Sequence, residues 1–266
     1  MLETLGYLSA LLIGVILGVM GGGGSIITVP VLVYIMHYSP VVATGYSLFV
    51  VGSTSAVGAA MYWRRGLVQI KTAISFGIPT ALSVYLTRQF LVPAIPDVMF
   101  KVGSFAITKS LFLMILFAVL MILASISMIR KREHKTAEEN KKTIKLNYLG
   151  ITLQGLAIGL LTGLVGVGGG FMIVPALVIL LGIDMKVAVG TSLLIMAANS
   201  LTGFLGDIFT SKIEWNFLLI FTAISIAGIF IGNAISKKVD GDNLKHGFGW
   251  FVLAMGFFII VNELWL

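Results

Sequence analysis

The pattern of hydrophobic and polar positions divides the chain into long apolar runs separated by short polar stretches. The first run is the clearest, because residues 4–63 contain no aspartate, glutamate, lysine or arginine. A bilayer core about 30 Å thick needs about 20 apolar residues per helix, so runs of this length predict transmembrane helices. The predicted segments are 4–36, 41–63, 67–90, 104–130, 147–182, 185–209, 215–236 and 246–265.

The composition supports a membrane protein. The chain is 58% hydrophobic and 11% charged, with a mean hydropathy of +1.04, whereas a soluble domain carries about 25% charged residues. The runs are apolar on every face, which excludes the alternating strands of a β-barrel. The predicted fold class is therefore an all-α integral membrane protein that crosses the inner or plasma membrane several times. Its N-terminal run lacks a basic region and cleavage site, and we expect a first helix there rather than a signal peptide.

One stretch is strongly polar. Residues 130–145, "RKREHKTAEENKKTIK", hold seven of the eighteen basic residues. Lysine and arginine are enriched in cytoplasmic loops, so this stretch predicts a cytoplasmic linker. The predicted organisation is a first transmembrane repeat over 1–130, a basic linker over 131–146, and a second repeat over 147–266.

An internal repeat supports this division. "GVMGGGGSIITVPVLV" (Gly18–Val33) aligns without gaps with "GLVGVGGGFMIVPALV" (Gly163–Val178), and the offset of 145 residues continues into the next segments. The run 4–36 would be about 50 Å long as one helix, too long for the bilayer. The sequence therefore predicts two homologous repeats of four to five segments each, whose first helices break at the glycines.

The orientation of the repeats follows from parity. If the piece after each break crosses the membrane, each half has an odd number of crossings and the repeats are inverted. With the linker inside, this arrangement places Lys237, Lys238 and Lys245 on the same side as Arg64 and Arg65, as the bias of basic residues towards the cytoplasm favours. We expect inverted repeats with both termini outside.

The glycine runs predict a binding site. Each helical glycine costs about 1 kcal/mol relative to alanine, and backbone groups freed in the bilayer must find partners or line a cavity. Two half-helix N-termini facing each other would offer amides and positive dipole ends to an anion, with no buried arginine or lysine needed. The candidate residues are Gly21, Gly22, Gly23, Gly24, Ser25, Gly166, Gly168, Gly169 and Gly170. Close helix packing is the alternative, and we favour it for Gly14, Gly18, Gly159 and Gly163.

Polar side chains in the following segments could line the same site. These candidates are Ser47, Ser55, Thr191, Ser192, Asn199 and Ser200; hydrogen bonding between helices is the alternative. Two ionisable residues near the spans are further candidates. Lys109 would counter substrate charge or extend to the interface. Asp207 would carry a coupling proton or pair with a basic loop residue.

Together these motifs resemble the TauE/SafE family of sulfite exporters, also called the toluene sulfonate uptake permease family. The resemblance rests on the two copies of "G-x-x-G-x-G-G-G…P", followed by "ATGYSL" and "VGTSLL", and covers essentially the whole chain. The first copy departs from it, with "GGGGS" where the second has the more typical "GVGGG". The resemblance implies secondary transport of sulfite, sulfonates, sulfoacetate or other small sulfur-containing or organic anions.

The predicted function is secondary transport of a small anion bound between the two glycine breaks, with one half rocking against the other. The expected partners are this anion and membrane lipid, with no nucleic acid; a coupling proton and a homo-oligomer remain open. We expect no enzymatic activity, no cofactor and no metal. One alternative is an ion channel or cation carrier that uses unwound backbone carbonyls. The other is an assembly subunit without transport.

Overall fold

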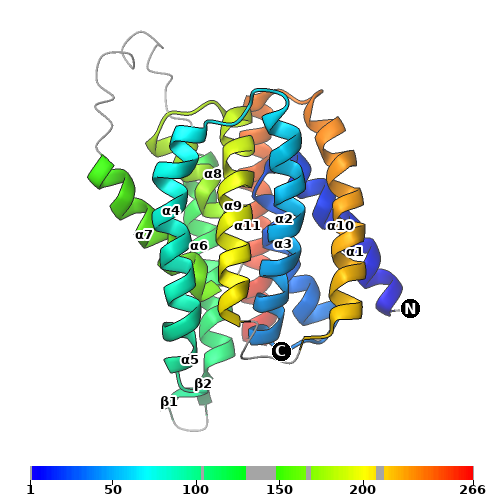
Figure 1. The fold of residues 1–266 in the computed structure, drawn as a ribbon. Helices are drawn as coiled ribbons and strands as arrows, with labels where there is room; N and C mark the ends of the chain where they lie inside the picture. Colours follow the sequence, from blue (N-terminus) through cyan, green and yellow to red (C-terminus); the bar gives the residue numbers. More distant parts are fainter. Residues whose placement is uncertain (1, 103–104, 130–147, 166–168, 208–212, 266) are drawn as a thin grey trace.

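The computed structural model describes residues 2–102, 105–129, 148–165, 169–207 and 213–265. The elements are helices joined by short connections and one β-hairpin (Figure 1). The α-helices are α1 (Leu2–Met20), α2 (Gly23–Pro30), α3 (Pro40–Trp63), α4 (Ile70–Leu86), α5 (Val92–Ala94), α6 (Lys109–Ile129), α7 (Tyr148–Val165), α8 (Gly170–Pro175), α9 (Met185–Asp207), α10 (Trp215–Ser236) and α11 (Gly241–Trp265). Three π-helical turns continue α2, α4 and α8: η1 (Val31–Ile35), η2 (Thr87–Leu91) and η3 (Ala176–Leu180).

In the part of the chain that the structure describes, five helices are long and apolar enough to cross a membrane: α3, α6, α9, α10 and α11. This confirms the prediction of a helical integral membrane protein. The structure adds one short element, because β1 (Val98–Val102) and β2 (Phe105–Thr108) form an antiparallel hairpin, and the segment predicted at 104–130 is helical only from Lys109 onwards. The hairpin lies beyond the end of the helix bundle in Figure 1. Backbone must be helical where it is exposed to the hydrocarbon core of the membrane. A hairpin beyond the end of the bundle is outside that region.

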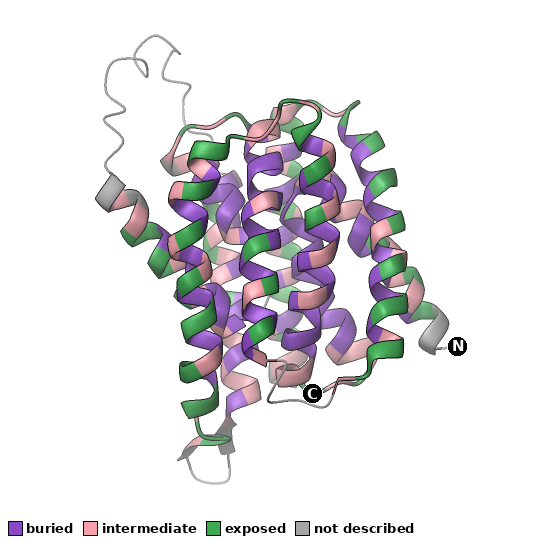
Figure 2. Ribbon diagram, in the orientation of Figure 1, coloured by how far each residue is buried: buried purple, intermediate pink, exposed green. Residues whose placement is uncertain are grey.

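Helices α3 and α9 lie side by side in the centre of the bundle. In their most apolar stretches 67% and 72% of the residues are buried, against 33% for α11. Figure 2 shows the same gradient, with buried residues facing inwards and exposed ones on the outer faces of the surrounding helices. Polar side chains on α3 and α9 are therefore the ones most fully shielded from lipid.

The two halves of the sequence interlock. The four most extensive helix contacts pair α1 with α10, α4 with α7, α3 with α9, and α6 with α11, so that each joins residues 1–130 to residues 147–266. The sequence halves are not separate bodies. The predicted rocking of one half against the other stays a prediction, and it would have to separate these contacts.

Small residues allow these contacts. A Cβ atom on Gly14 would collide with the carbonyl of Ser225 on α10, and a Cβ atom on Gly159 would lie 2.5 Å from the carbonyl oxygen of Thr80 on α4. The two contacts are related by the offset of 145 residues, which joins position 14 to 159 and position 80 to 225. The packing interpretation is confirmed for these glycines and for their neighbours one turn along, Gly18 and Gly163.

Two equivalent hydrogen bonds fix the starts of α4 and α10. The hydroxyl of Thr191 on α9 accepts a hydrogen bond of 3.0 Å from the amide of Gln69, just before α4. The hydroxyl of Tyr46 on α3 accepts one of 2.8 Å from the amide of Glu214, just before α10. Both donors and both acceptors are 145 residues apart. The sequence repeat thus corresponds to a repeat of tertiary contacts.

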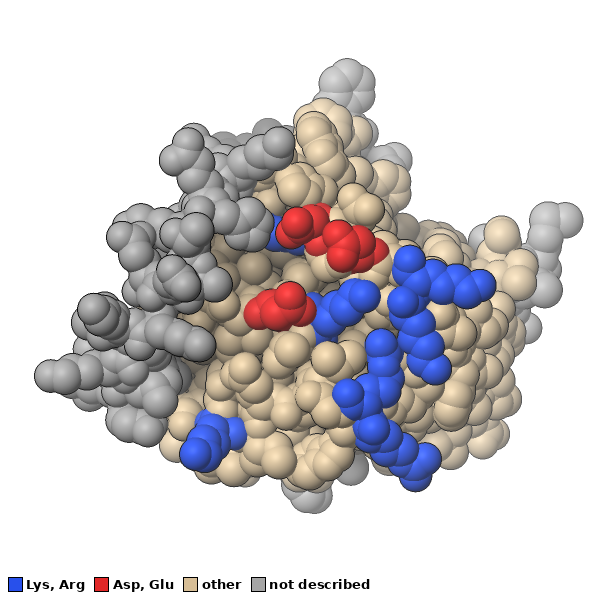
Figure 3. All heavy atoms as spheres, turned by 90° about the horizontal axis from the view of Figure 1, so that it is seen from above, with Lys and Arg blue, Asp and Glu red and all other residues tan. Residues whose placement is uncertain are grey.

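The bundle has two chemically different ends. The connections at 64–69, 181–184 and 237–240 lie at one end, seen from above in Figure 3, where lysine and arginine side chains gather. We call this the basic end. Its basic residues are Arg64, Arg65, Lys71, Lys186, Lys237, Lys238 and Lys245, and its acidic residues are Asp184, Asp240 and Asp242. The β-hairpin and the segments at 36–39 and 213–214 lie at the opposite end.

Candidate functional site

The first glycine run breaks the helix in which it lies. α1 ends at Met20, Gly21 has a left-handed φ of +72°, and α2 starts at Gly23. Side chains other than glycine rarely adopt this conformation. The predicted break is therefore present in the first copy.

The second run ends in the same way. α7 ends at Val165, Gly169 has a left-handed φ of +78°, and α8 starts at Gly170. The predicted site residues Gly166 and Gly168 lie outside the described residues. The described helix ends nevertheless show that the second apolar run is also interrupted.

The two breaks touch each other. A Cβ atom on Gly22 would collide with the carbonyl of Gly170, and one on Gly170 would lie 2.8 Å from the Cα atom of Gly22. A Cβ atom on Gly170 would also collide with the sulfur of Met196 on α9. The backbones of the two halves thus meet beside α9, where only glycine fits on either side.

Two of the predicted glycines also have a packing role. A Cβ atom on Gly23 would lie 2.7 Å from the side chain of Ile16, and one on Gly24 would lie 2.7 Å from that of Leu17. These glycines let α2 fold back closely against α1. The unbroken glycine run in the sequence favours anion contact over packing at these two positions. Contact between their amides and an anion stays a prediction.

Several buried polar side chains on α3 and α9 have no hydrogen-bond partner among the described residues. Most buried polar groups in proteins are paired, so each exception needs an explanation, such as a ligand. Four of them were predicted from the sequence as site residues: Ser47, Ser55, Asn199 and Ser200. The fifth, Thr54, was not included, although it is equivalent to Asn199 by the offset of 145 residues.

The other predicted hydroxyls have partners within the protein. Ser25 donates to the carbonyl of Gly22 at 2.7 Å, and Ser192 donates to the carbonyl of Val189 at 2.9 Å. The hydroxyl of Thr191 already accepts from the start of α4. Thr191 therefore has a structural role. The hydroxyl protons of Ser25 and Ser192 are already donated within the protein, so these two oxygens could only accept a further hydrogen bond.

The first glycine break and part of the unpartnered group contact the same helix, α9. A Cβ atom on Gly21 would lie 3.0 Å from the hydroxyl oxygen of Ser192, and one on Gly52 would lie 3.1 Å from the Cβ atom of Ser200. Residues seven apart share a helix face, so Asn199 lies on the face of α9 that Ser192 presents to the first break. The first break and Asn199 therefore lie along the same face of α9, about two helical turns apart.

Three charged side chains cluster towards the opposite end of the bundle. Nη1 of Arg88, which is only 1% exposed, lies 3.6 Å from the carboxylate of Asp207. Nζ of Lys109 is also buried, donates to the carbonyl of Val92 and interacts electrostatically with Asp207. Asp207 thus pairs with a helical arginine, Arg88. The site predicted at the breaks needs no buried basic residue, but the described part of the bundle contains two, Arg88 and Lys109.

Sequence reasoning missed Arg88. The signal was available, since Arg88 is the one charged residue between Ile74 and Leu91 in a predicted span. An ionisable residue in a span is a candidate functional residue.

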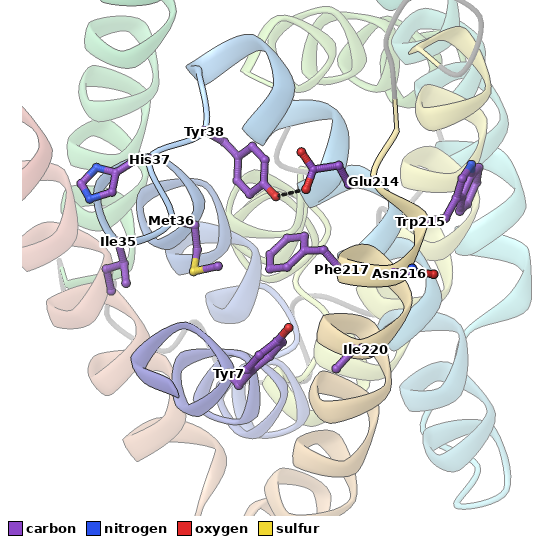
Figure 4. A pocket seen from close by; sticks show the side chains of 10 residues that line it. All are labelled: Tyr7, Ile35, Met36, His37, Tyr38, Glu214, Trp215, Asn216, Phe217 and Ile220. Carbon is purple, nitrogen blue, oxygen red and sulfur yellow. Dashed lines mark hydrogen bonds between the residues drawn. The ribbon is translucent and has the colours of Figure 1, made fainter. Parts of the chain in front are cut away.

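A pocket of about 800 Å³ lies at the opposite end (Figure 4). Its walls include Tyr7, Met36, Tyr38, Glu214 and Phe217. The Tyr38 hydroxyl donates to the Glu214 carboxylate at 2.8 Å. Burial, followed by this hydrogen bond, raises the pKa of the Tyr38 phenol.

An aromatic layer separates this pocket from the charged cluster. The ring of Tyr38 lies 5.2 Å from that of Tyr46 and 5.3 Å from that of Phe217. Tyr46 in turn lines a small second cavity together with Gly45 and Asp207. Tyr46 therefore contacts the aromatic wall of the pocket and also lines the cavity beside Asp207.

Comparison with known proteins identifies the family. Residues 7–259 match the family model described as "Sulfite exporter TauE/SafE". The chain belongs to the TauE/SafE family. This confirms the resemblance seen in the glycine motifs.

Relatives of this TauE/SafE protein carry general names. A "Probable membrane transporter protein" of Xylella fastidiosa is 26% identical over 94% of this chain and 91% of its own. "Probable membrane transporter protein YunE" of Bacillus subtilis is 26% identical over 86% of this chain and 87% of its own. A similarly named protein of Methanocaldococcus jannaschii is 25% identical over 94% of each chain. No solved structure matches the chain.

These findings make the protein a membrane transporter of the TauE/SafE family. The family and the relatives are named as exporters or transporters and not as enzymes, which agrees with the sequence prediction. The relatives' names specify no substrate.

Proposed function

We propose that the protein is a secondary transporter of a small anion, such as sulfite, an organosulfonate or a related sulfur-containing anion. The anion would bind where the two glycine breaks meet α3 and α9. The observation that carries this proposal is the set of buried, unpartnered polar side chains beside the breaks: Ser47, Thr54, Ser55, Asn199 and Ser200. Unpartnered buried groups cost stability, and a ligand that hydrogen-bonds to them offsets this cost.

The chemistry of the surroundings favours an anion. The first amides of a helix have no partner within it, and the helix dipole adds partial positive charge; α2 and α8 both begin at the breaks. The hydroxyls and the Asn199 amide can add neutral donors. None of the fully buried side chains in the described part of the chain is a carboxylate, so nothing there would select a cation by charge.

The architecture we propose is a pair of inverted repeats. Two observations support it. After the first break, α2 and η1 lead to the opposite end, whereas α8 and η3 lead to the basic end after the second (Figure 1). Equivalent contacts, whose residues differ by the offset of 145, also occur at opposite ends of the bundle. The hydrogen bond that Thr191 accepts lies at the basic end, and the one that Tyr46 accepts lies at the opposite end.

The moving units would then be mixed. One unit contains α1, α3 and α10; the other contains the equivalent α7, α9 and α4, and the two meet where α3 packs on α9. Each unit takes one helix from the other half of the sequence. Rocking of these units against each other would open the polar set to either side in turn, with Asp207 as the carboxylate available for a coupling proton.

We propose that the basic end faces the cytoplasm and that the membrane is the inner or plasma membrane. The basic residues of that end outnumber its acidic ones by seven to three among the described residues, as expected for a cytoplasmic face. The pocket of Figure 4 would then open to the outside.

Transport in liposomes tests the proposed function. Purified protein should carry sulfite or methanesulfonate along an imposed gradient, and Asn199→Leu should remove this flux. Ser83→Ala is a matched control on a buried hydroxyl whose partner is a backbone carbonyl, and it should retain the flux. Cation flux without anion flux would instead support a channel or cation carrier that uses backbone carbonyls. Absence of any flux would support an assembly subunit.

A further inference from the structure

Arg88 is the most deeply buried charged residue in the described part of the chain. It lies in η2, at the end of α4, and Nη1 pairs with Asp207. Its Nε and Nη2 atoms are buried and have no hydrogen-bond partner in the described part of the chain. These two nitrogens form one edge of the guanidinium, from which two parallel N–H groups point in the same direction.

An unpartnered guanidinium edge is costly in a protein interior. A buried donor without a partner costs about 1–3 kcal/mol, and a charged donor costs more. The chain tolerates this cost at a position where methionine or leucine would fill a similar space. The parallel N–H groups match the two oxygens of a carboxylate or sulfonate.

The charge balance points to the same kind of ligand. Arg88 and Lys109 bring two positive charges, and Asp207 brings one negative charge. These three described residues therefore carry a net charge of +1, and buried charges are normally paired. A monovalent anion at the free edge would make the cluster neutral.

We propose that Arg88 binds an oxyanion, a sulfonate, sulfite or carboxylate, through its Nε and Nη2 atoms while Nη1 stays on Asp207. This second site lies towards the opposite end, behind the aromatic layer of Tyr38, Tyr46 and Phe217. It rests on the proposed function, since it would hold the anion between the outer pocket and the central polar set. The site also specifies the substrate class. The two parallel N–H groups require a ligand with two oxygens, and the net charge of the cluster requires an anion.

Binding of methanesulfonate to the purified full-length protein tests this site. Arg88→Lys keeps the positive charge but loses the two parallel N–H groups of the guanidinium. The affinity for methanesulfonate should therefore fall on the order of tenfold or more. Asp207→Asn removes the compensating charge, so methanesulfonate should bind more tightly and raise the melting temperature more than in the unmodified protein. Arg65→Lys is the control, because Arg65 already donates to Asn233 and lies over the ring of Tyr62.

The outcomes separate this proposal from the proposed function. Unchanged methanesulfonate affinity in Arg88→Lys, or weaker binding in Asp207→Asn, would overturn the proposed Arg88 site. Water would then be the hydrogen-bond partner of Nε and Nη2. If Arg88→Lys does not fold, the response of Asp207→Asn decides alone. Anion flux that depends on Asn199 but not on Arg88 would leave only the proposed function standing. Methanesulfonate binding that depends on Arg88, without any flux, would leave only this site.

Discussion

Thr54 on α3 and Asn199 on α9 occupy equivalent positions 145 residues apart, and both carry buried polar atoms that have no hydrogen-bond partner among the residues the structure describes. The neighbouring serines, Ser55 and Ser200, repeat this relationship. A buried polar side chain without a partner destabilises a fold. Here such side chains occur at equivalent positions in both halves of the chain. We infer that these residues are kept for binding and not for stability.

This inference predicts opposite effects on stability and binding. Ser200→Ala removes an unpartnered hydroxyl, so the free energy of unfolding should stay level or rise by up to about 1 kcal/mol, while anion affinity falls. Ser225→Ala is the comparison, since Ser225 donates to the carbonyl of Ala10 at 3.0 Å, and it should destabilise by about 1 kcal/mol. Melting curves with and without sulfite measure both quantities. A clear loss of stability in Ser200→Ala would show that its hydroxyl has a structural partner.

The contact between the two breaks predicts a strict requirement for glycine. Gly22→Ala forces a methyl group into the backbone of Gly170, so it should cost about 1–3 kcal/mol and abolish transport. Gly247→Ala is a control on α11, where the nearest atom to the added methyl is 3.8 Å away, and it should be neutral or slightly stabilising. Thermal unfolding and liposome flux check both variants. Normal flux in Gly22→Ala would mean that the breaks separate freely.

The proposed orientation can be tested by labelling, because the chain has no cysteine of its own. Asn216→Cys introduces a thiol beside the pocket at the opposite end, and Asp240→Cys introduces one at the basic end. A membrane-impermeant thiol reagent should label the first variant in intact cells. It should label the second only after the membrane is permeabilised. The reverse pattern would place the basic end outside.

The pKa of Tyr38 predicts a pH effect. Burial and the hydrogen bond to Glu214 raise this pKa, so the folded protein holds the phenol proton more tightly than the unfolded chain does. The resulting stability is present below about pH 10, the ordinary pKa of tyrosine, and is lost as the pH rises further. Tyr38→Phe should therefore make the decline in melting temperature above about pH 10 shallower. Glu214→Gln should have the same effect only in part, because burial remains.

Much of the fold could be predicted from the sequence because lipid imposes simple requirements. The bounds predicted for α3 and α10 agree with the structure to within one residue, since apolar runs bounded by polar residues leave little choice. The break at Gly21 follows from the length of the first run, and the polar set on α3 and α9 follows from the repeat.

The rest depended on tertiary contacts that a repeat alone does not specify. Arg88 pairs with Asp207, which is far away in the sequence, and neither residue indicates the other. The apolar faces of α4 and α10 do not show that each packs on the first helix of the opposite half. The hairpin before α6 is short and lies outside the bundle, where the pattern of apolar runs carries little information.

The exchange of α4 and α10 between the halves has a consequence for biosynthesis. α1 leaves the ribosome first, yet the surface that receives Gly14 and Gly18 belongs to α10, which is made about 200 residues later. The early helices must therefore wait in the bilayer, unpaired, until nearly the whole polypeptide has been inserted. Neither half, produced alone, would contain the partner that its first helix needs.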